Sequence, residues 1–197
     1  TTAQIGVLTT DDIDGLDTAQ VGALTSAQVA AMSTANLASF STEQIAALGT
    51  RVFASLTSDQ VTALTSAQIG VLSTGQLAAL STGAIAGLQT EDMATFDSSE
   101  LALLSTRTIA ALSTENLGAL TSAQLTGLTG AQVAALTSAQ VGSLTSAQID
   151  GFSTAQIGAL TSAQAQNLST DGLVSFSTEQ VAALGSRAVG SLTTDQL

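Results

Sequence analysis

The chain of 197 residues contains no cysteine, histidine, tryptophan, tyrosine or lysine. Without cysteine it can form neither disulfides nor thiolate metal sites. Without histidine and lysine it lacks the bases that usually activate a serine nucleophile. We therefore expect a protein that is not an enzyme, with no catalytic residue, no metal ligand and no cofactor.

Positive charge is scarce as well. The chain contains fifteen acidic residues and only three arginines, so the formal net charge is −12 at pH 7. Such a surface repels phosphate backbones and anionic lipid headgroups, so we expect no nucleic-acid partner. No apolar run approaches the ~18–20 residues that a membrane-spanning helix needs, so we expect no membrane insertion.

What the sequence does contain is a strict repeat of eight residues. Every eighth position from Leu8 to Leu192 is a large apolar residue, and nineteen of these 24 positions are leucine. A second apolar column follows five residues after each, ending at Leu197 and weakest at Ala165. A unit this small cannot bury a core alone and must stack on its neighbours. We predict one array over residues 1–197, about 24.5 repeats long and excerpted from a longer chain.

Each repeat, or octad, is numbered here from the residue after the leucine column. Position one is Ser, Thr, Asp or Gly in 24 of 25 octads, and position four is Gln in fifteen. In one octad, Thr25 and Gln28 have the spacing of a capping box, in which each side chain satisfies the other residue's N–H. The next Ser/Thr pair competes for backbone hydrogen bonds, and the frequent glycines of positions six and seven, such as Gly142, mark helix ends. We predict an all-α solenoid, or superhelix, of very short helices, one per octad.

Two other folds fit the pattern less well. A β-solenoid requires apolar residues at every second position, whereas here the apolar spacing alternates between three and five. A continuous helix would carry a stripe of average period four, which drifts around a 3.6-residue helix. The small Ala and Gly positions favour the solenoid because they let neighbouring helices approach closely.

The three arginines, Arg51, Arg107 and Arg187, all occupy position three of their octads. Acids recur at seven or eight residues from them: Glu43 and Asp59 around Arg51, Glu100 and Glu115 around Arg107, Glu179 and Asp195 around Arg187. One interpretation is that a longer segment was copied during repeat expansion. The other is that arginines bridge acids on adjacent helices, which predicts that the Arg51 guanidinium lies near Glu43 or Asp59.

The densest acidic cluster consists of Asp11, Asp12, Asp14 and Asp17. Carboxylate oxygens suit Ca²⁺, but the glycine and spacing of an EF-hand loop are missing. Acids in a first helical turn complement the helix dipole and add solubility, and we favour that explanation.

A column of hydroxyls is the remaining recurrent feature, because position two is Ser or Thr in 24 of 25 octads. These hydroxyls either bond between neighbouring octads and solvate the helix starts, or they form a regular surface that binds polysaccharide or ice.

The segment Leu24–Ala31, Leu-Thr-Ser-Ala-Gln-Val-Ala-Ala, resembles the LTxxQ[VI]xAL octapeptide arrays of very large bacterial secreted or cell-surface proteins. The resemblance covers the whole chain and implies an extracellular, adhesin-like or scaffold role without catalytic residues. The octad also looks like the opening helix of TAL-effector DNA-binding repeats, but that likeness stops after eight residues.

From these features we expect a structural array at a bacterial surface, acting as a spacer, stalk or self-associating filament. Its expected partners are copies of itself, in lateral or end-to-end contact, or flanking repeats. The alternative is a binding module that uses the hydroxyl column to hold a glycan or ice.

Overall fold

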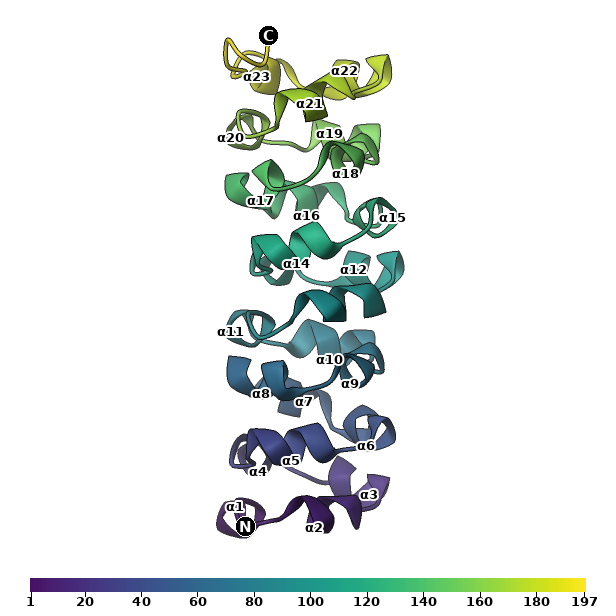
Figure 1. The fold of residues 1–197 in the computed structure, drawn as a ribbon, viewed down its shortest axis with the longest axis vertical. Helices are drawn as coiled ribbons and strands as arrows, with labels where there is room; N and C mark the ends of the chain where they lie inside the picture. Colours follow the sequence, from purple (N-terminus) through teal and green to yellow (C-terminus); the bar gives the residue numbers. More distant parts are fainter. The chain divides into compact units, whose positions relative to one another are not determined.

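A computed structural model describes residues 1–197 and shows an all-α protein of 24 short helices, 23 of them α-helices and one a 3₁₀ helix. The chain divides into two compact units, Thr1–Thr95 and Phe96–Leu197. Figure 1 shows that in both units the ribbon changes direction after each helix. That residues 1–197 form one array stays a prediction.

The first unit contains twelve of the helices: α1 (Thr2–Ile5), α2 (Thr10–Asp14), α3 (Thr18–Gly22), α4 (Ser26–Ala30), α5 (Thr34–Ser39), α6 (Thr42–Ala47), α7 (Thr50–Phe53), α8 (Ser58–Ala63), α9 (Ser66–Gly70), α10 (Thr74–Ala79), α11 (Thr82–Ile85) and the 3₁₀ helix η1 (Thr90–Thr95).

The second unit contains the other twelve: α12 (Ser98–Leu103), α13 (Thr106–Ala110), α14 (Thr114–Ala119), α15 (Ser122–Leu125), α16 (Gly130–Ala135), α17 (Ser138–Gly142), α18 (Ser146–Asp150), α19 (Thr154–Gly158), α20 (Ser162–Ala165), α21 (Thr170–Val174), α22 (Thr178–Ala183) and α23 (Ser186–Val189).

Helix starts follow the predicted capping chemistry. Thr25 is the N-cap of α4 in an extended conformation, with φ −83° and ψ 159°. Its backbone N–H donates to Gln28 Oε1 at 2.8 Å, and its hydroxyl accepts from the Gln28 N–H at 3.3 Å. The predicted capping box is confirmed. Among the α-helices, only α7 and α23 lack a side-chain cap, because their N-caps are Gly49 and Gly185.

Helices pack on the helix three places further along the chain. In the first unit α1 contacts α4, α2 contacts α5, and the series continues to α9 with η1. In the second unit the same series runs from α12 with α15 to α20 with α23. Each turn of the stack therefore consists of three octads, and the predicted solenoid architecture is confirmed within each unit.

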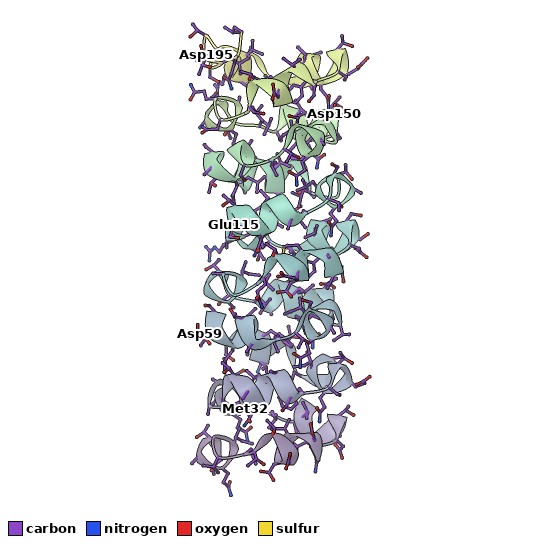
Figure 2. The ribbon with its side chains drawn as sticks, viewed as in Figure 1. Met32, Asp59, Glu115, Asp150 and Asp195 are labelled. Atoms are coloured by element: carbon purple, nitrogen blue, oxygen red, sulfur yellow. The ribbon has the colours of Figure 1, made fainter.

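The two apolar columns form the core. The second column is the deeper one: Phe53, Ile109 and Val133 are fully buried. The leucine column closes over it, and Met32, which Figure 2 labels, is 5% exposed. Even Ala165, the smallest member of the second column, is fully buried.

Glycines lie at several helix ends, as expected: Gly6 is the C-cap of α1, α3 ends at Gly22 and α17 ends at Gly142. No residue in the chain has a positive φ, so no helix ends on a left-handed glycine. Some glycines also lie where the backbones of successive turns meet. A Cβ on Gly142 would lie 2.9 Å from the Asn167 carbonyl oxygen, and one on Gly127 would collide with the Ser98 backbone. The expected close approach at small residues is confirmed, and so is the expected position of glycines such as Gly142 at helix ends.

No helix of the chain is both long and apolar enough to cross a bilayer.

Candidate functional site: a buried glutamine ladder

The most regular polar feature of the interior is the amide side chain at position four. Gln156 is typical, because only 2% of its surface is exposed. Its Oε1 accepts from the Ser153 N–H at 2.8 Å, which caps its own helix, α19. Its Nε2 donates to the carbonyl oxygens of Leu125 and Leu128, each at 2.8 Å. One amide therefore caps the start of α19 and also binds carbonyls at the C-terminal end of α15, in the preceding turn.

The same bond recurs at a spacing of 28 residues, from the position-four amide to a carbonyl of the leucine column. The distance from the amide nitrogen to the carbonyl oxygen ranges from 2.6 to 3.5 Å. It is 2.6 Å between Gln68 and Phe40 and 3.5 Å between Gln60 and Met32. We call this set the glutamine ladder. Its members are Asn36, Gln44, Gln60, Gln68, Gln76, Gln124, Gln132, Gln140, Gln148, Gln156, Gln164, Gln180 and Gln196.

The first turn shows that stacking creates the ladder. The side-chain hydrogen bonds of Gln4, Gln20 and Gln28 stay within their own octads. These three residues are exposed or half-buried, whereas Gln44 is buried. The capping box forms in both settings, so the donation to an earlier turn is the additional contribution of packing.

Burying so many amides is tolerable because all are satisfied. A buried polar group without a partner costs about 1–3 kcal/mol. No buried side-chain nitrogen or oxygen in the chain lacks a hydrogen bond. The ladder also provides donors for carbonyls at helix C-termini. The last four carbonyls of a helix have no partner within it, so most carbonyls of a four- to six-residue helix need a partner elsewhere.

One octad departs from the ladder in an instructive way. In residues 89–96, position one is Gln89 and position four is Asp92, which is fully buried. The Asp92 carboxylate accepts from the Gln89 N–H and from the Ser66 hydroxyl, each at 2.8 Å. Gln89 Nε2 donates to the Thr62 carbonyl at 3.2 Å. The amide has moved from position four to position one and still reaches the preceding turn.

Sequence reasoning identified only half of the glutamine's role. A signal for the other half was available, because a capping box accepts Glu as readily as Gln. Position four nevertheless holds Gln in fifteen octads and Glu only at Glu100. A strong preference for the amide over the carboxylate indicates a required N–H donor.

Comparison of the chain with models of known protein families identifies the repeat. A family model described as the ALTTAQ repeat matches residues 1–26, 23–58, 46–74, 93–130, 109–146 and 143–170, which together cover more than half of the chain. The chain belongs to the ALTTAQ repeat family. Comparison with curated proteins yields no match.

The ALTTAQ pattern corresponds to positions seven and eight of one octad and one to four of the next, as in Ala119–Gln124. It therefore runs from the leucine column through the N-cap to the ladder glutamine. The predicted relationship to tandem octapeptide arrays is confirmed at the level of the ALTTAQ repeat.

The three arginines lie exposed on α7, α13 and α23. Stacking joins helices three apart, so α7 packs on α4 and α10, whereas Glu43 lies on α6 and Asp59 on α8. The residues that line the open hollow around Arg187, of about 680 Å³, include no acid. The proposed ion pairs of Arg51 and Arg187, and those of Arg107, stay predictions.

All but one of the acids that were expected to partner these arginines are also exposed, and Figure 2 shows Asp59 and Asp195 among the outward-facing side chains of their units. Glu100 is half-buried and accepts from the Asp97 N–H at 2.8 Å. The pKa of Glu43 is lowered by its own backbone N–H and then by the hydroxyls of Ser41 and Thr42. Glu115 and Glu179 repeat this arrangement.

The acidic cluster at the start of the chain has a local explanation. Asp12 accepts from the Thr9 N–H and hydroxyl at 2.9 and 2.7 Å, and these hydrogen bonds lower the pKa of its carboxyl. Asp17 is the N-cap of α3. The structure gathers no acids into a group that could hold a metal ion.

Part of the hydroxyl column bonds between turns. Ser26 donates to the Arg51 carbonyl at 2.9 Å, Ser122 to the Ala147 carbonyl at 2.8 Å and Ser162 to the Arg187 carbonyl at 3.3 Å. Each acceptor lies 25 residues further along the chain. The expectation that position two bonds between octads is confirmed at these serines.

Proposed function

We propose that this ALTTAQ array is a non-catalytic spacer or scaffold within a secreted or cell-surface protein. The observation that carries the proposal is the glutamine ladder, in which each amide ties a turn of three octads to the turn before it. Each hydrogen bond makes a net contribution of about 0.5–1.5 kcal/mol to the stability of the fold. A series of such bonds along each unit therefore resists separation of its turns.

The amino-acid composition supports the same role. The side chains that commonly perform nucleophilic or metal chemistry, cysteine and histidine, are missing, and every buried polar side-chain atom already has a hydrogen-bond partner within the chain. The proposed site of action, outside a bacterial cell, rests on the resemblance to octapeptide arrays of large surface proteins. Labelling of intact cells that express an epitope-tagged chain would test it: a tag that antibodies reach only after lysis would contradict a surface location.

A spacer must lengthen in proportion to its octads. We would duplicate residues 121–144, one turn of three octads, and measure the maximum dimension by small-angle X-ray scattering. Packed helices lie 8–10 Å apart, so each added turn should lengthen the particle by about 8–10 Å. A matched insert of glycine and serine of the same length serves as the control. The proposal would be contradicted if the maximum dimension increased by less than this, or by the same amount as in the control.

The hydroxyl column offers a second proposal, a surface that binds glycan or ice. It is favoured by the hydroxyls of position two that remain exposed, such as Thr34 and Thr74. Thermal hysteresis and glycan retention measured on the whole chain test it directly, and the absence of both would end it.

A further inference from the structure

Position four lacks an amide side chain in four consecutive octads, which together span residues 81–112. The residues at this position are Ala84, Asp92, Glu100 and Thr108. Elsewhere in the chain such an interruption spans a single octad, at Asp12, Val52, Gly172 and Ala188. A turn consists of three octads, so an isolated interruption leaves amides on the other two octads of its turn. Residues 81–112, in contrast, contain more than a full turn of octads without one.

None of these four side chains replaces the ladder donor. Alanine has no polar group, and an ionised carboxylate only accepts hydrogen bonds. The Glu100 carboxylate accepts from the Asp97 N–H at 2.8 Å, within its own octad. The hydroxyls of Thr108 and Ser105 lie 2.8 Å apart, also within one octad. The segment 81–112 therefore has no position-four group that donates to an earlier turn as a ladder amide does.

The hydrogen bonds that replace the ladder in the first unit come from less buried side chains. The Thr62 hydroxyl donates to the Gly87 carbonyl at 3.0 Å, and the Ser66 hydroxyl donates to Asp92 at 2.8 Å. Thr62 is exposed and Ser66 is half-buried. The ladder amide of Gln68, in contrast, is buried and donates to three carbonyls. Because hydrogen bonds are stronger where water is excluded, the replacements resist separation of turns less than the ladder does.

Two further observations mark the same segment. The helix η1 is the only 3₁₀ helix of the chain, and hydrogen bonds in 3₁₀ helices have poorer geometry than those in α-helices. It contains Asp92, the only buried acid, and burial of a carboxylate opposes folding because the group loses its hydration. The boundary between the two compact units also falls within this segment, after Thr95.

We propose that residues 81–112 form a compliant joint, a segment that opens locally while the rest of each unit stays folded. Proteins open in cooperative segments whose stability varies along the chain. The ladder raises the resistance of a turn to opening, and the compliant joint is the stretch in which a full turn lacks it. The inference deepens the proposed spacer role, on which its use to the protein rests, because a spacer with such a joint yields at a defined point. Lengthening with added octads tests the spacer alone, so the two proposals can fail separately.

The arginines allow a direct test by limited trypsin digestion of the 197-residue chain under native conditions. The chain contains no lysine, so trypsin can cut only after its three arginines. Arg51 and Arg107 are both exposed, in the similar sequences Thr-Arg-Val and Thr-Arg-Thr, and both octads lack the position-four amide. They differ in that Arg51 lies between octads that carry Gln44 and Gln60, whereas Arg107 lies in the compliant joint.

We expect cleavage after Arg107 to be about tenfold faster than cleavage after Arg51, or more, because cleavage of a folded chain follows the population of its open form. Each rate is divided by the rate at the same arginine in the chain unfolded in urea, which removes differences in intrinsic susceptibility. Local capping alone predicts the opposite order: α7 begins at Gly49 without a side-chain cap, whereas Ser105 caps α13. Equal normalised rates, or faster cleavage after Arg51, would overturn the inference.

A filled variant tests whether the missing amides are the cause. It carries Ala84→Gln, Gln89→Thr, Asp92→Gln, Glu100→Gln and Thr108→Gln, so that all four octads have a regular N-cap and a position-four amide. We expect its normalised cleavage after Arg107 to fall to about the rate after Arg51. A filled variant that keeps the preference of the natural chain for Arg107 would also overturn the inference.

Hydrogen exchange of the natural chain, followed by mass spectrometry, gives a result even if circular dichroism shows that the filled variant does not fold. Backbone amides of residues 81–112 should exchange faster than those of residues 57–80 and 121–144. These two control segments each contain three octads with ladder glutamines. Equal protection of the three segments would contradict the compliant joint.

Discussion

Gln156 joins two turns of the array through a single amide: Nε2 donates to the Leu128 carbonyl 28 residues earlier at 2.8 Å, while Oε1 accepts from the N-cap of its own helix. The bond explains how helices of four to six residues persist. Isolated helices shorter than about 12–15 residues are marginal in water, so each must be held by its neighbours. The ladder couples the start of each helix to the end of an earlier one.

Two glycines of the second unit should respond oppositely to alanine. At Gly127 a new Cβ would collide with the Ser98 backbone, whereas at Gly118, within α14, it would meet nothing within 4 Å. We expect Gly127→Ala to destabilise by about 1–3 kcal/mol and Gly118→Ala to stabilise by about 0.4–1 kcal/mol. Urea unfolding followed by circular dichroism measures both, and effects of the same sign would contradict the packing of turns described here.

The inter-turn hydroxyls should contribute modestly to stability. Ser122→Ala removes the bond to the Ala147 carbonyl, so we expect a loss of about 0.5–1 kcal/mol. Ser138 occupies the same position in α17 and makes no such bond, so Ser138→Ala serves as the control and should be nearly neutral. Equal effects of the two substitutions in chemical denaturation would show that position two acts only on its own helix.

Acid should weaken helix starts at the glutamates of position three. In the folded chain the pKa of Glu115 is lowered from 4.5 by its own N–H and then by the Ser113 and Thr114 hydroxyls. A lowered folded-state pKa contributes stability above the unfolded value, and that stability is lost as the pH falls through the folded value. We expect Thr114→Val to raise the pKa of Glu115 in a ¹³C NMR titration and to leave the pKa of Glu43 unchanged. An unaltered Glu115 titration would exclude the Thr114 hydroxyl as a cause.

The irregular octad 89–96 should accept the regular pattern. Asp92 is fully buried and supplies no amide donor to the turn below. Gln89→Thr with Asp92→Gln restores the N-cap and the ladder amide, so we expect the double variant to be more stable than the natural chain. Asp92→Gln alone should gain less, since Gln89 would still occupy the N-cap position. A double variant less stable than the natural chain in urea unfolding would show that the Ser66–Asp92 hydrogen bond matters more than the ladder at this point.

Much of the local structure could be predicted from the octad. The N-cap, the short helix and both buried columns follow from capping chemistry and apolar spacing, and Thr25 begins α4 as expected. The number of octads in a turn could not be predicted. Octads of similar sequence give the same repeat pattern whether a turn contains two, three or four of them. The prediction of the Arg51 pairs assumes that consecutive octads lie close together, whereas helix packing joins octads three apart, and the pairs themselves stay a prediction.

The site itself was only partly predictable, for a related reason. The local role of Gln28 follows from a spacing of three residues, but the donation by Gln156 to Leu128 depends on the turn length. The close approach of Gly127 to Ser98 likewise depends on the turn length, because the two residues meet only once turns are stacked. Contacts along the chain could be assigned to named residues from the sequence, whereas contacts across turns could be expected only in kind, without the residues that they join.

The ladder is tested most directly by comparing Gln156→Glu with Gln20→Glu in equilibrium urea unfolding at neutral pH. Glutamate preserves both capping boxes, but at position 156 it places a carboxylate against two carbonyl oxygens and removes the donor. We predict that Gln156→Glu lowers the free energy of unfolding by about 1–3 kcal/mol. Gln20→Glu should change it by less than about 0.5 kcal/mol, because the Gln20 side chain bonds only within its own octad. Equally small effects at both positions would contradict the central claim that position-four amides hold successive turns together.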